Sequence, residues 1–165
     1  MAFDFLSWFA GFTDGEGCFV IRKKSQHSYS TVFAITLRDD DIDVLLKIQE
    51  VLKIGTVYRS VCVTNLGSCH VAHFRCYGKS DALKLVEIFD SYPLQAKKAR
   101  DYAIWRKAVL ENQKSSGTRD RKMMKYLHDK IRLVKKYDAP SDLANSDYEP
   151  PGVQLGLNWP SDVDY

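Results

Sequence analysis

The chain has 165 residues, of which 45% are hydrophobic, and a formal net charge of +3. This length suffices for one domain with its own core, and the composition is that of a globular protein. Apolar runs stay shorter than the roughly 18 residues of a membrane span, and the start of the chain lacks the basic region of a signal peptide. We therefore expect an intracellular protein with no membrane partner, in a bacterial cytoplasm or in an organelle such as a mitochondrion or chloroplast.

The charge is distributed unevenly along the chain. Residues 137–165 hold six acidic side chains and no Lys or Arg, so residues 1–136 carry 24 basic and 15 acidic side chains, a net charge of +9. We predict a domain at 1–136 whose basic character favours a polyanionic partner. Residues 137–165, with four of the five prolines, are expected to be an acidic tail that is either extended or disordered.

The periodicity of apolar residues predicts an α+β domain in which two β-hairpins alternate with helices (αββαββα), followed by an extra C-terminal helix. The two hairpins pair into a four-stranded antiparallel sheet with one face against the helices. In chain order we first expect a helix at 3–14, strands at 18–24 and 31–37, and a helix that begins at Asp39 or Asp40 and ends at Gly55. Strands at 56–64 and 70–77 follow, and then a helix that Ser80 caps and Tyr92-Pro93 ends. The last two expected helices are one at 94–112 and one whose inward residues are Met123, Leu127, Ile131 and Val134.

Strand alternation assigns side chains to the two faces of this sheet. On the first strand Phe19 and Ile21 share a face, and on the fourth strand Ala72, Phe74 and Cys76 do. Arg and Gln side chains can read guanine and adenine edges in the DNA major groove, and a twisted two-stranded ribbon fits that groove. A plain solvated face carries the same residue types and is the alternative. The opposite face holds Val20, Arg22, Lys24 and Gln26 on the first strand and Val71, His73, Arg75 and Tyr77 on the fourth.

The cysteines do not occur as C-x-x-C pairs, and a zinc site built from Cys69, His70, His73 and Cys76 would not follow a standard ligand spacing. If 70–77 is a strand, His73 and Cys76 point to opposite faces. We expect free thiols, which is consistent with a reducing compartment.

Residues 9–17 read Phe-Ala-Gly-Phe-Thr-Asp-Gly-Glu-Gly and continue a short apolar, helix-like run. The carbonyls at the end of a helix have no internal partner and carry the negative end of its dipole. With the Glu16 carboxylate between Gly15 and Gly17, they make an all-oxygen, negative site that suits a hard divalent cation such as Mg²⁺. The alternative is a helix C-cap beside an ordinary surface acid.

The same nine residues resemble the signature of the LAGLIDADG homing endonucleases, with Phe for both Leu residues, Thr for Ile, Gly for the second Ala and Glu for the second Asp. The resemblance extends over about residues 3–136 in the order of elements. It implies a saddle-shaped sheet and a site-specific double-stranded DNA endonuclease that uses Mg²⁺, with Mn²⁺ or Ca²⁺ as other occupants of the metal site. Because one signature copy is present, it also implies a homodimer on a long, nearly palindromic target.

The family pattern implies roles for particular residues. Glu16 and the Gly15 carbonyl match the metal ligands, whereas Asp14 matches a first acid that is more structural and helps to terminate the helix. Lys97, or alternatively Lys98, matches a lysine near the scissile phosphate. The first helix and the start of a later one are thus expected to meet at one site.

The polar residue that often follows the second strand in this family aligns with Leu37 or Arg38, so the implied catalytic set is Glu16, Lys97 and Arg38. Two signature helices are implied to pack at a two-fold axis, where small side chains allow close approach; packing of Gly11 within its own subunit is the alternative. The implied dimer interface consists of Phe9, Ala10, Gly11 and Thr13. The implied DNA contacts are Val20, Arg22, Lys24, Gln26, Tyr58, Ser60, His73 and Arg75.

Two other functions are compatible with the same fold. Some relatives act as maturases that bind intron RNA, so intron RNA is a second candidate partner. A non-catalytic DNA-binding regulator is the third candidate, and it would tolerate loss of the second acid. This chain keeps Glu16 and Lys97, which favours cleavage of double-stranded DNA.

Overall fold

The structure, a computed structural model, describes residues 3–26, 28–64, 67–115 and 117–135. It is an α+β fold with one four-stranded antiparallel sheet and helices on one face, as the sequence predicts. The expected tail at 137–165 lies outside the described residues. The elements are α1 (Phe5–Glu16), β1 (Gly17–Ser25), β2 (Ser28–Arg38), a 3-10 turn η1 (Asp39–Asp41), α2 (Ile42–Leu52), β3 (Thr56–Thr64), β4 (Gly67–Cys76), α3 (Lys79–Ser91), α4 (Lys98–Gln113) and α5 (Arg121–Val134).

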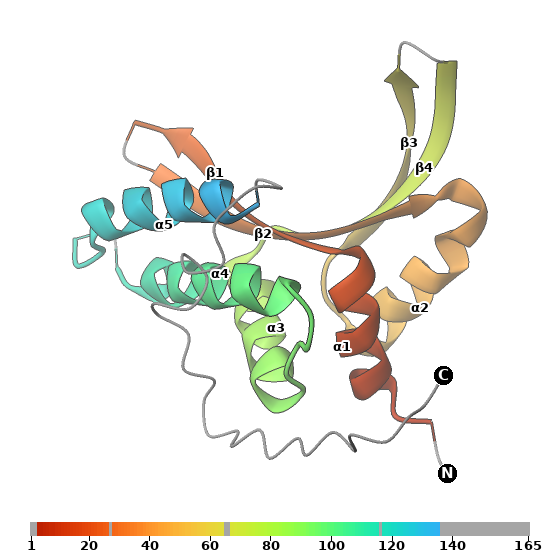
Figure 1. The fold of residues 1–165 in the computed structure, drawn as a ribbon, viewed down its shortest axis with the longest axis horizontal. Coiled ribbons are helices and arrows are strands. Elements are labelled where there is room, and N and C mark those ends of the chain that lie inside the picture. The colour runs from red at the N-terminus through yellow and green to blue at the C-terminus, as the bar shows by residue number, and fades with distance from the viewer. Residues whose placement is uncertain (1–2, 27, 65–66, 116, 136–165) are drawn as a thin grey trace, which may run out of the picture.

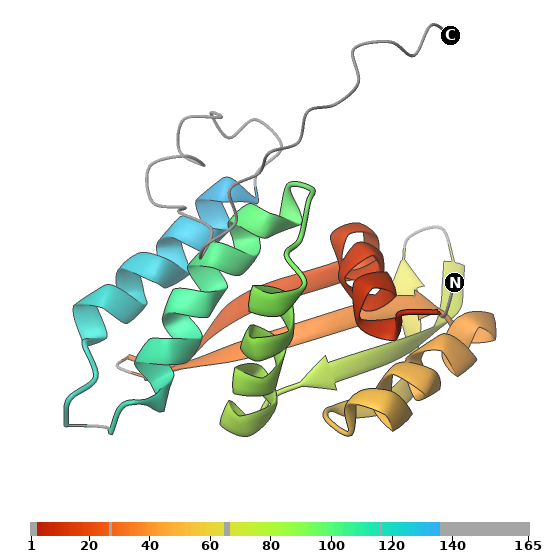
Figure 2. The same cartoon turned by 90° about the horizontal axis from the view of Figure 1, so that it is seen from below.

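The sheet has the strand order β1-β2-β4-β3, so the second strand of each hairpin lies in the middle. β2 and β4 pair antiparallel, from Phe33 opposite Cys76 to Arg38 opposite Val71. Figure 1 shows both hairpins bending away from the helices, which makes the free face concave and gives the saddle shape. Figure 2 shows α1, α3 and α4 crossing the other face, with α5 alongside α4. No helix in the described part of the chain is long and apolar enough to cross a membrane.

The alternation predicted for the strands is confirmed at the positions that face the helices. Phe19, Ile21, Ala72, Phe74 and Cys76 are all buried. Their neighbours on the same strands point to the concave face, which the helices leave open. This division separates a packed core from a surface that can bind a partner.

Aromatic rings make up the centre of the core. Phe9 from α1 lies 6.2 Å from Phe33 and 5.5 Å from Phe89, measured between ring centroids. Phe19 contacts Phe33 at 5.2 Å and Trp105 of α4 at 5.3 Å. The buried Trp105 indole donates its N–H to a backbone carbonyl of β2 at 3.1 Å, which satisfies the polar atom of this residue inside the core. The cluster therefore holds α1, α3 and α4 on the same face of the sheet.

Two helix starts differ from the sequence-based expectation. α3 begins at Lys79 with Gly78 as its N-cap, so Ser80 lies inside the helix and was wrongly assigned as the cap. The Ser80 hydroxyl instead donates to Asp81 at 3.5 Å. α4 begins at Lys98 rather than at residue 94, because residues 94–97 form a separate turn that is held by a side chain from α1.

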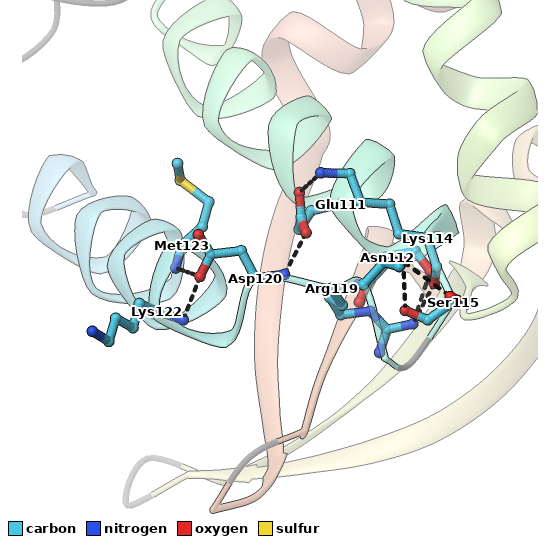
Figure 3. Close-up of polar contacts among 9 residues, drawn as sticks. Glu111, Asn112, Lys114, Ser115, Arg119, Asp120, Lys122 and Met123 are labelled. Carbon is cyan, nitrogen blue, oxygen red and sulfur yellow. Dashed lines mark hydrogen bonds and ion pairs between the residues drawn. The ribbon is translucent and has the colours of Figure 1, made fainter.

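Polar contacts at the α4–α5 connection fix where α5 begins (Figure 3). The Glu111 carboxylate accepts hydrogen bonds from the Lys114 ammonium group and from the Asp120 backbone N–H, both at 2.6 Å. The bond to Lys114, followed by the bond to Asp120, lowers the pKa of Glu111. Asp120 then caps α5 through its side chain. Because the helix starts there, Met124 is buried and Met123 is 44% exposed, so the prediction that Met123 faces inward was wrong.

The junction between α1 and β1 has no loop. α1 continues through Glu16, two residues beyond its predicted end, and Gly17 is both its C-cap and the first residue of β1. A Cβ atom on Gly17 would lie 2.5 Å from the Thr13 methyl carbon, 2.7 Å from the Thr13 carbonyl oxygen and 3.3 Å from the Phe33 ring. This close approach requires glycine at the junction.

We predict that Gly17→Ala lowers the free energy of unfolding by about 1–3 kcal/mol, because the backbone must move to relieve the overlap with Thr13. The matched control is Gly15→Ala in the same helix, where an added Cβ meets no atom within 4 Å. Urea unfolding followed by circular dichroism measures both variants. Equal stability of Gly17→Ala and wild type would show that the junction tolerates a side chain.

Candidate functional site

Glu16 occupies the last position of α1 and is exposed. Because α1 ends there, the carbonyls of residues 14–16 have no partner within the helix, while the Thr13 carbonyl accepts the Gly17 N–H. Within the described residues the Glu16 carboxylate has no hydrogen bond or ion pair. The carboxylate and the neighbouring carbonyls are therefore available to a ligand from outside the protomer.

The donor set at this position fits a partly hydrated Mg²⁺ ion. No group of three or more His, Cys, Asp or Glu side chains that could hold a metal occurs among the described residues. Mg²⁺ commonly keeps several waters and takes only one or two carboxylates together with substrate phosphates. The Glu16 carboxylate and the Gly15 carbonyl match that incomplete coordination, in which an anionic substrate supplies the remaining oxygens.

Asp14 joins the end of α1 to the start of α4. Its Oδ2 accepts the backbone N–H of Gln95 at 2.7 Å, and its Oδ1 accepts that of Ala96 at 3.1 Å. The turn that precedes α4 is thereby held against the last turn of α1. Nothing in the sequence pattern points to this contact, because it joins segments about 80 residues apart. The sequence-based prediction gave Asp14 a structural role, but that role was to end the first helix.

The tethered turn carries Lys97, the N-cap residue of α4, which is exposed. Together with Asp14 it lines a hollow of about 500 Å³. Lys135 closes one side of this hollow by donating to the Phe19 carbonyl. The structure therefore brings the predicted Lys97, with Lys98 as its neighbour, to the end of α1 that carries Glu16. The hollow is lined by Asp14, Cys18, Ala96, Lys97, Lys98, Arg100, Asp101 and Lys135.

Asp101 is the buried acid of this hollow. Its side chain is largely buried, and desolvation raises its pKa, while Lys135 and then Arg100 act in the opposite direction. Arg100 lies 3.7 Å away and also donates to the carbonyl of Val134 at 2.6 Å. The hollow is lined by three lysines and Arg100 but by only two acids, so its net charge is positive and suits a phosphate group.

Arg38 lies apart from this site. Leu37 points toward the core and Arg38 toward the free face, so strand alternation favours Arg38 over Leu37 for a polar role. The Arg38 guanidinium pairs with the Asp40 carboxylate through two bonds, at 3.1 and 2.8 Å. It lines a different hollow, with Cys69 and His70, so the structure does not gather Arg38 with Lys97.

His73 is part of the floor of the concave face. Its Nδ1 lies 2.9 Å from the Thr36 hydroxyl and its Nε2 lies 2.8 Å from the Ser60 hydroxyl. Burial, and next the charge of Arg75, lower the pKa of His73, which favours the neutral ring. Both ring nitrogens of His73 and the Ser60 hydroxyl thus form hydrogen bonds within the protomer. These two predicted DNA contacts therefore have fewer polar atoms available for DNA.

Arg75 lies on the same face and is half-buried, and its Nε is buried without a hydrogen bond to the described residues. Its guanidinium lies 5.7 Å from the centroid of the Tyr58 ring and donates to the Tyr77 hydroxyl at 3.3 Å. That bond is the main reason why the pKa of Tyr77 is lowered, whereas desolvation raises the pKa of Tyr58. The charge of Arg22 acts on both tyrosines, so arginines from β1 and β4 flank one aromatic pair.

The end of β1 departs from the predicted alternation. The pairing with β2 shifts between Lys23 and Ser25, which marks a β-bulge or similar irregularity, and Gln26 lies in the turn beyond the strand. A bulge re-aims the side chains that follow it. Strict alternation therefore ends at Lys23, while Lys24 and Gln26 are exposed and Val20 is half-buried.

The residues predicted for a dimer interface divide between two faces of α1. Phe9, Ala10 and Thr13 are buried inside the protomer, so their side chains cannot meet a partner and that part of the prediction was wrong. The physical reason is that this face packs on the aromatic core. Gly11 is exposed, and a Cβ atom there would meet no atom within 4 Å. No neighbour within the described protomer requires a glycine at this position.

Comparison with known proteins identifies the same segment. A family model described as LAGLIDADG endonuclease matches residues 9–109. The probable intron-encoded endonuclease Cox1-I1b of Schizosaccharomyces pombe is 33% identical over 112 residues, which cover 66% of this chain and 28% of that protein. The uncharacterized mitochondrial protein RF1 of Saccharomyces cerevisiae is 27% identical over 109 residues, covering 66% and 22%. The chain thus spans less than a third of the length of these relatives.

Solved structures share the fold. The meganuclease I-SmaMI bound to cleaved DNA has a TM-score of 0.65 at 17% identity, covering 86% of this chain and 47% of that chain. The homing endonuclease I-TnaI has a TM-score of 0.57 at 23% identity, covering 80% of this chain and 100% of that chain. The family match includes the whole nine-residue signature and extends over more than half of the chain. The chain belongs to the LAGLIDADG endonuclease family.

Proposed function

We propose that this protein is a site-specific endonuclease that hydrolyses both strands of duplex DNA with a divalent metal ion. The observation that carries the proposal is the exposed Glu16 carboxylate at the end of α1, next to the turn that bears Lys97. A basic, concave sheet face adjoins this site. Several structures with the same fold, among them I-AabMI and I-SmaMI, are described as bound to DNA.

Each group at the site has a task in phosphodiester hydrolysis. Glu16 and the Gly15 carbonyl would hold the cation, for which we propose Mg²⁺, with Mn²⁺ or Ca²⁺ as other occupants. When bound, such an ion neutralises the phosphoryl oxygens and lowers the pKa of a coordinated water. The Lys97 ammonium group has no hydrogen bond in the described part of the chain, so it can approach a phosphate oxygen and stabilise charge that develops there.

The concave face is proposed to read the sequence of the target. Arg22 and Arg75 present guanidinium groups that can form bidentate bonds to guanine, and Tyr58 supplies a rigid aromatic surface between the strands. Val20, Lys24 and Gln26 extend this surface toward the end of the first hairpin. Ser60 and His73 act beneath it, since their mutual hydrogen bond already fixes their side chains.

A homodimer is proposed because one signature supplies one Glu16, whereas cleavage of two strands needs two sites. Gly11 lies at the centre of the exposed side of α1, with Ser7 and Gly15 one turn away in each direction. Glycine within a helix costs about 1 kcal/mol relative to alanine, and nothing within the described protomer requires it there. A two-fold axis at this surface would make the target nearly palindromic.

Intron RNA remains the alternative partner, because the relative Cox1-I1b is described as intron-encoded. We also propose that the protein acts in an organelle, since the relative RF1 is described as mitochondrial. A nicking assay on a plasmid library with Mg²⁺ tests the nuclease directly. Splicing assistance without cleavage would favour the maturase, and binding without cleavage would favour a regulator.

Glu16→Gln is expected to lower the single-turnover cleavage rate by at least about 100-fold while target binding persists, because it removes a charged metal ligand at an exposed position. The control is Glu87→Gln, the same change at an exposed position of α3. Cleavage is followed on a supercoiled plasmid and binding by gel shift. Turnover at the wild-type rate by Glu16→Gln would remove the metal-binding assignment.

Gly11→Leu is expected to abolish dimerisation and double-strand cleavage while the protomer stays folded, because the added side chain has space within the protomer but none between close helices. Sedimentation velocity gives the mass, which is 18.9 kDa for one chain, and circular dichroism reports the fold. Glu87→Leu on α3 controls for an added exposed leucine. A wild-type monomer that cuts both strands would contradict the dimer.

Arg22→Ala is expected to weaken binding of the preferred site by about 1–3 kcal/mol and to relax the choice of base at one position in each half-site. Lys47→Ala, which removes an exposed cation from α2 on the other face of the sheet, is the control. Selection from a randomised target library measures both effects. A uniform loss over all sequences would instead assign Arg22 to the phosphate backbone.

A further inference from the structure

We infer that Asp14 is a positioning residue for DNA cleavage: by binding two backbone amides ahead of α4, it holds Lys97 beside the metal-binding end of α1. This inference rests on the proposed endonuclease function. It gives the first acid of the signature a task different from that of Glu16, although the two residues are only two positions apart.

The contact uses both oxygens of the Asp14 carboxylate. Oδ2 accepts the Gln95 N–H at 2.7 Å and Oδ1 accepts the Ala96 N–H at 3.1 Å. Hydrogen bonds from backbone N–H groups to a charged carboxylate are stronger than those between neutral groups. A carboxylate with both oxygens bound in this way has less capacity for a metal ion, which leaves the metal to Glu16 and the Gly15 carbonyl.

The start of α4 has no side-chain cap of its own, and Asp14 holds the two residues that lie just before it. The N-cap is Lys97, and lysine has no acceptor with which to cap a helix. Backbone bonds from Ala99 to Ala96 and from Arg100 to Lys97 continue the turn into the helix. Asp14 binds the backbone N–H groups of the two residues before this N-cap, so it anchors the turn and not the first helical amides, and it places a negative charge near the positive end of the α4 dipole.

The backbone around Lys97 therefore sets where its ammonium group lies. The Lys97 side chain is exposed and has no hydrogen bond to the described residues, so no side-chain contact fixes it within the protomer. On the N-terminal side the turn is anchored by the buried Leu94. Between Leu94 and α4, the turn is tied to α1 by the two hydrogen bonds from backbone amides to the Asp14 carboxylate. Displacement of a catalytic group by about 1 Å can cost about 100-fold in rate.

A double-mutant cycle tests the coupling between the two residues. Asp14→Ala, Lys97→Ala and the double variant are compared with wild type in single-turnover cleavage with Mg²⁺. We expect each single variant to lose about 10–100-fold and the double variant to be no slower than the slower single variant, within about threefold. Independent contributions would multiply, and that result would overturn the positioning role.

Three further measurements separate positioning from other roles. The Mg²⁺ concentration that gives half-maximal rate should stay unchanged in Asp14→Ala, whereas a shift would make Asp14 a metal ligand. Affinity for the target in Ca²⁺ should stay near wild type and circular dichroism should show the native fold, whereas a general structural role would lower the affinity or disrupt the fold. Asp14→Asn, which keeps one acceptor oxygen, should recover part of the lost rate.

Amide hydrogen exchange tests the contact without any cleavage. In Asp14→Ala the Gln95 and Ala96 amides should exchange at least about tenfold faster, while the amides of β1 keep their protection. If wild type does not cut DNA, the endonuclease proposal fails, and this measurement still decides whether Asp14 holds the turn. Unchanged exchange at both amides would refute the tether even if cleavage is lost.

Discussion

The position of the acidic end of α1 depends on one close contact, between Gly17 and the residues that lie against it, Thr13 and Phe33. Because the helix passes into β1 without a loop, the direction of the helix and that of the strand are set by the same residue. The absence of a side chain at Gly17 lets the two elements approach closely enough for Thr13 to be buried and for Phe33 to pack beneath the junction. Glu16 is the residue just before this fixed point, so its carboxylate has a defined place relative to the sheet.

The site is completed by a segment that is remote in sequence. The aromatic cluster holds α4 on the same face of the sheet as α1, since Trp105 packs on Phe19 and Phe9 packs on Phe33. This packing brings the turn before α4 within reach of Asp14. Two hydrogen bonds then fix the turn locally. The core therefore brings α1 and α4 together, and the Asp14 carboxylate sets the position of the turn that carries Lys97.

The concave face combines fixed and available polar groups. Burial lowers the pKa of His73 and so favours its neutral ring, and both ring nitrogens lie within hydrogen-bonding distance of Thr36 and Ser60. His73 thereby links three adjacent strands instead of offering a free donor. A buried polar residue whose partners are all satisfied makes the surface above it rigid. The half-buried Arg75 lies beside His73 and holds its guanidinium against the Tyr58 ring. Such an arrangement limits the entropy lost when the arginine binds a partner.

The sequence by itself determined the element order, the buried positions of the strands and the acidic helix end. Each of these depends on local periodicity or on neighbouring residues, as the burial of Phe19 and Ile21 illustrates. The resemblance to the family also pointed to Glu16 and Lys97, whose catalytic roles stay predictions. The elements and the buried strand positions could be predicted because alternation and helical spacing are expressed within a few residues.

Only the tertiary structure decided which residues of α1 are buried, where α4 and α5 begin, and what Asp14 binds. Phe9, Ala10 and Thr13 belong to a signature that suggests an interface, yet the aromatic core takes up that face of the helix. Met124 rather than Met123 is buried because the α4–α5 connection sets the start of the last helix. The bonds from Asp14 to the turn before α4 cross about 80 residues. Such contacts depend on how whole elements pack against each other, and no local pattern of residues contains that information.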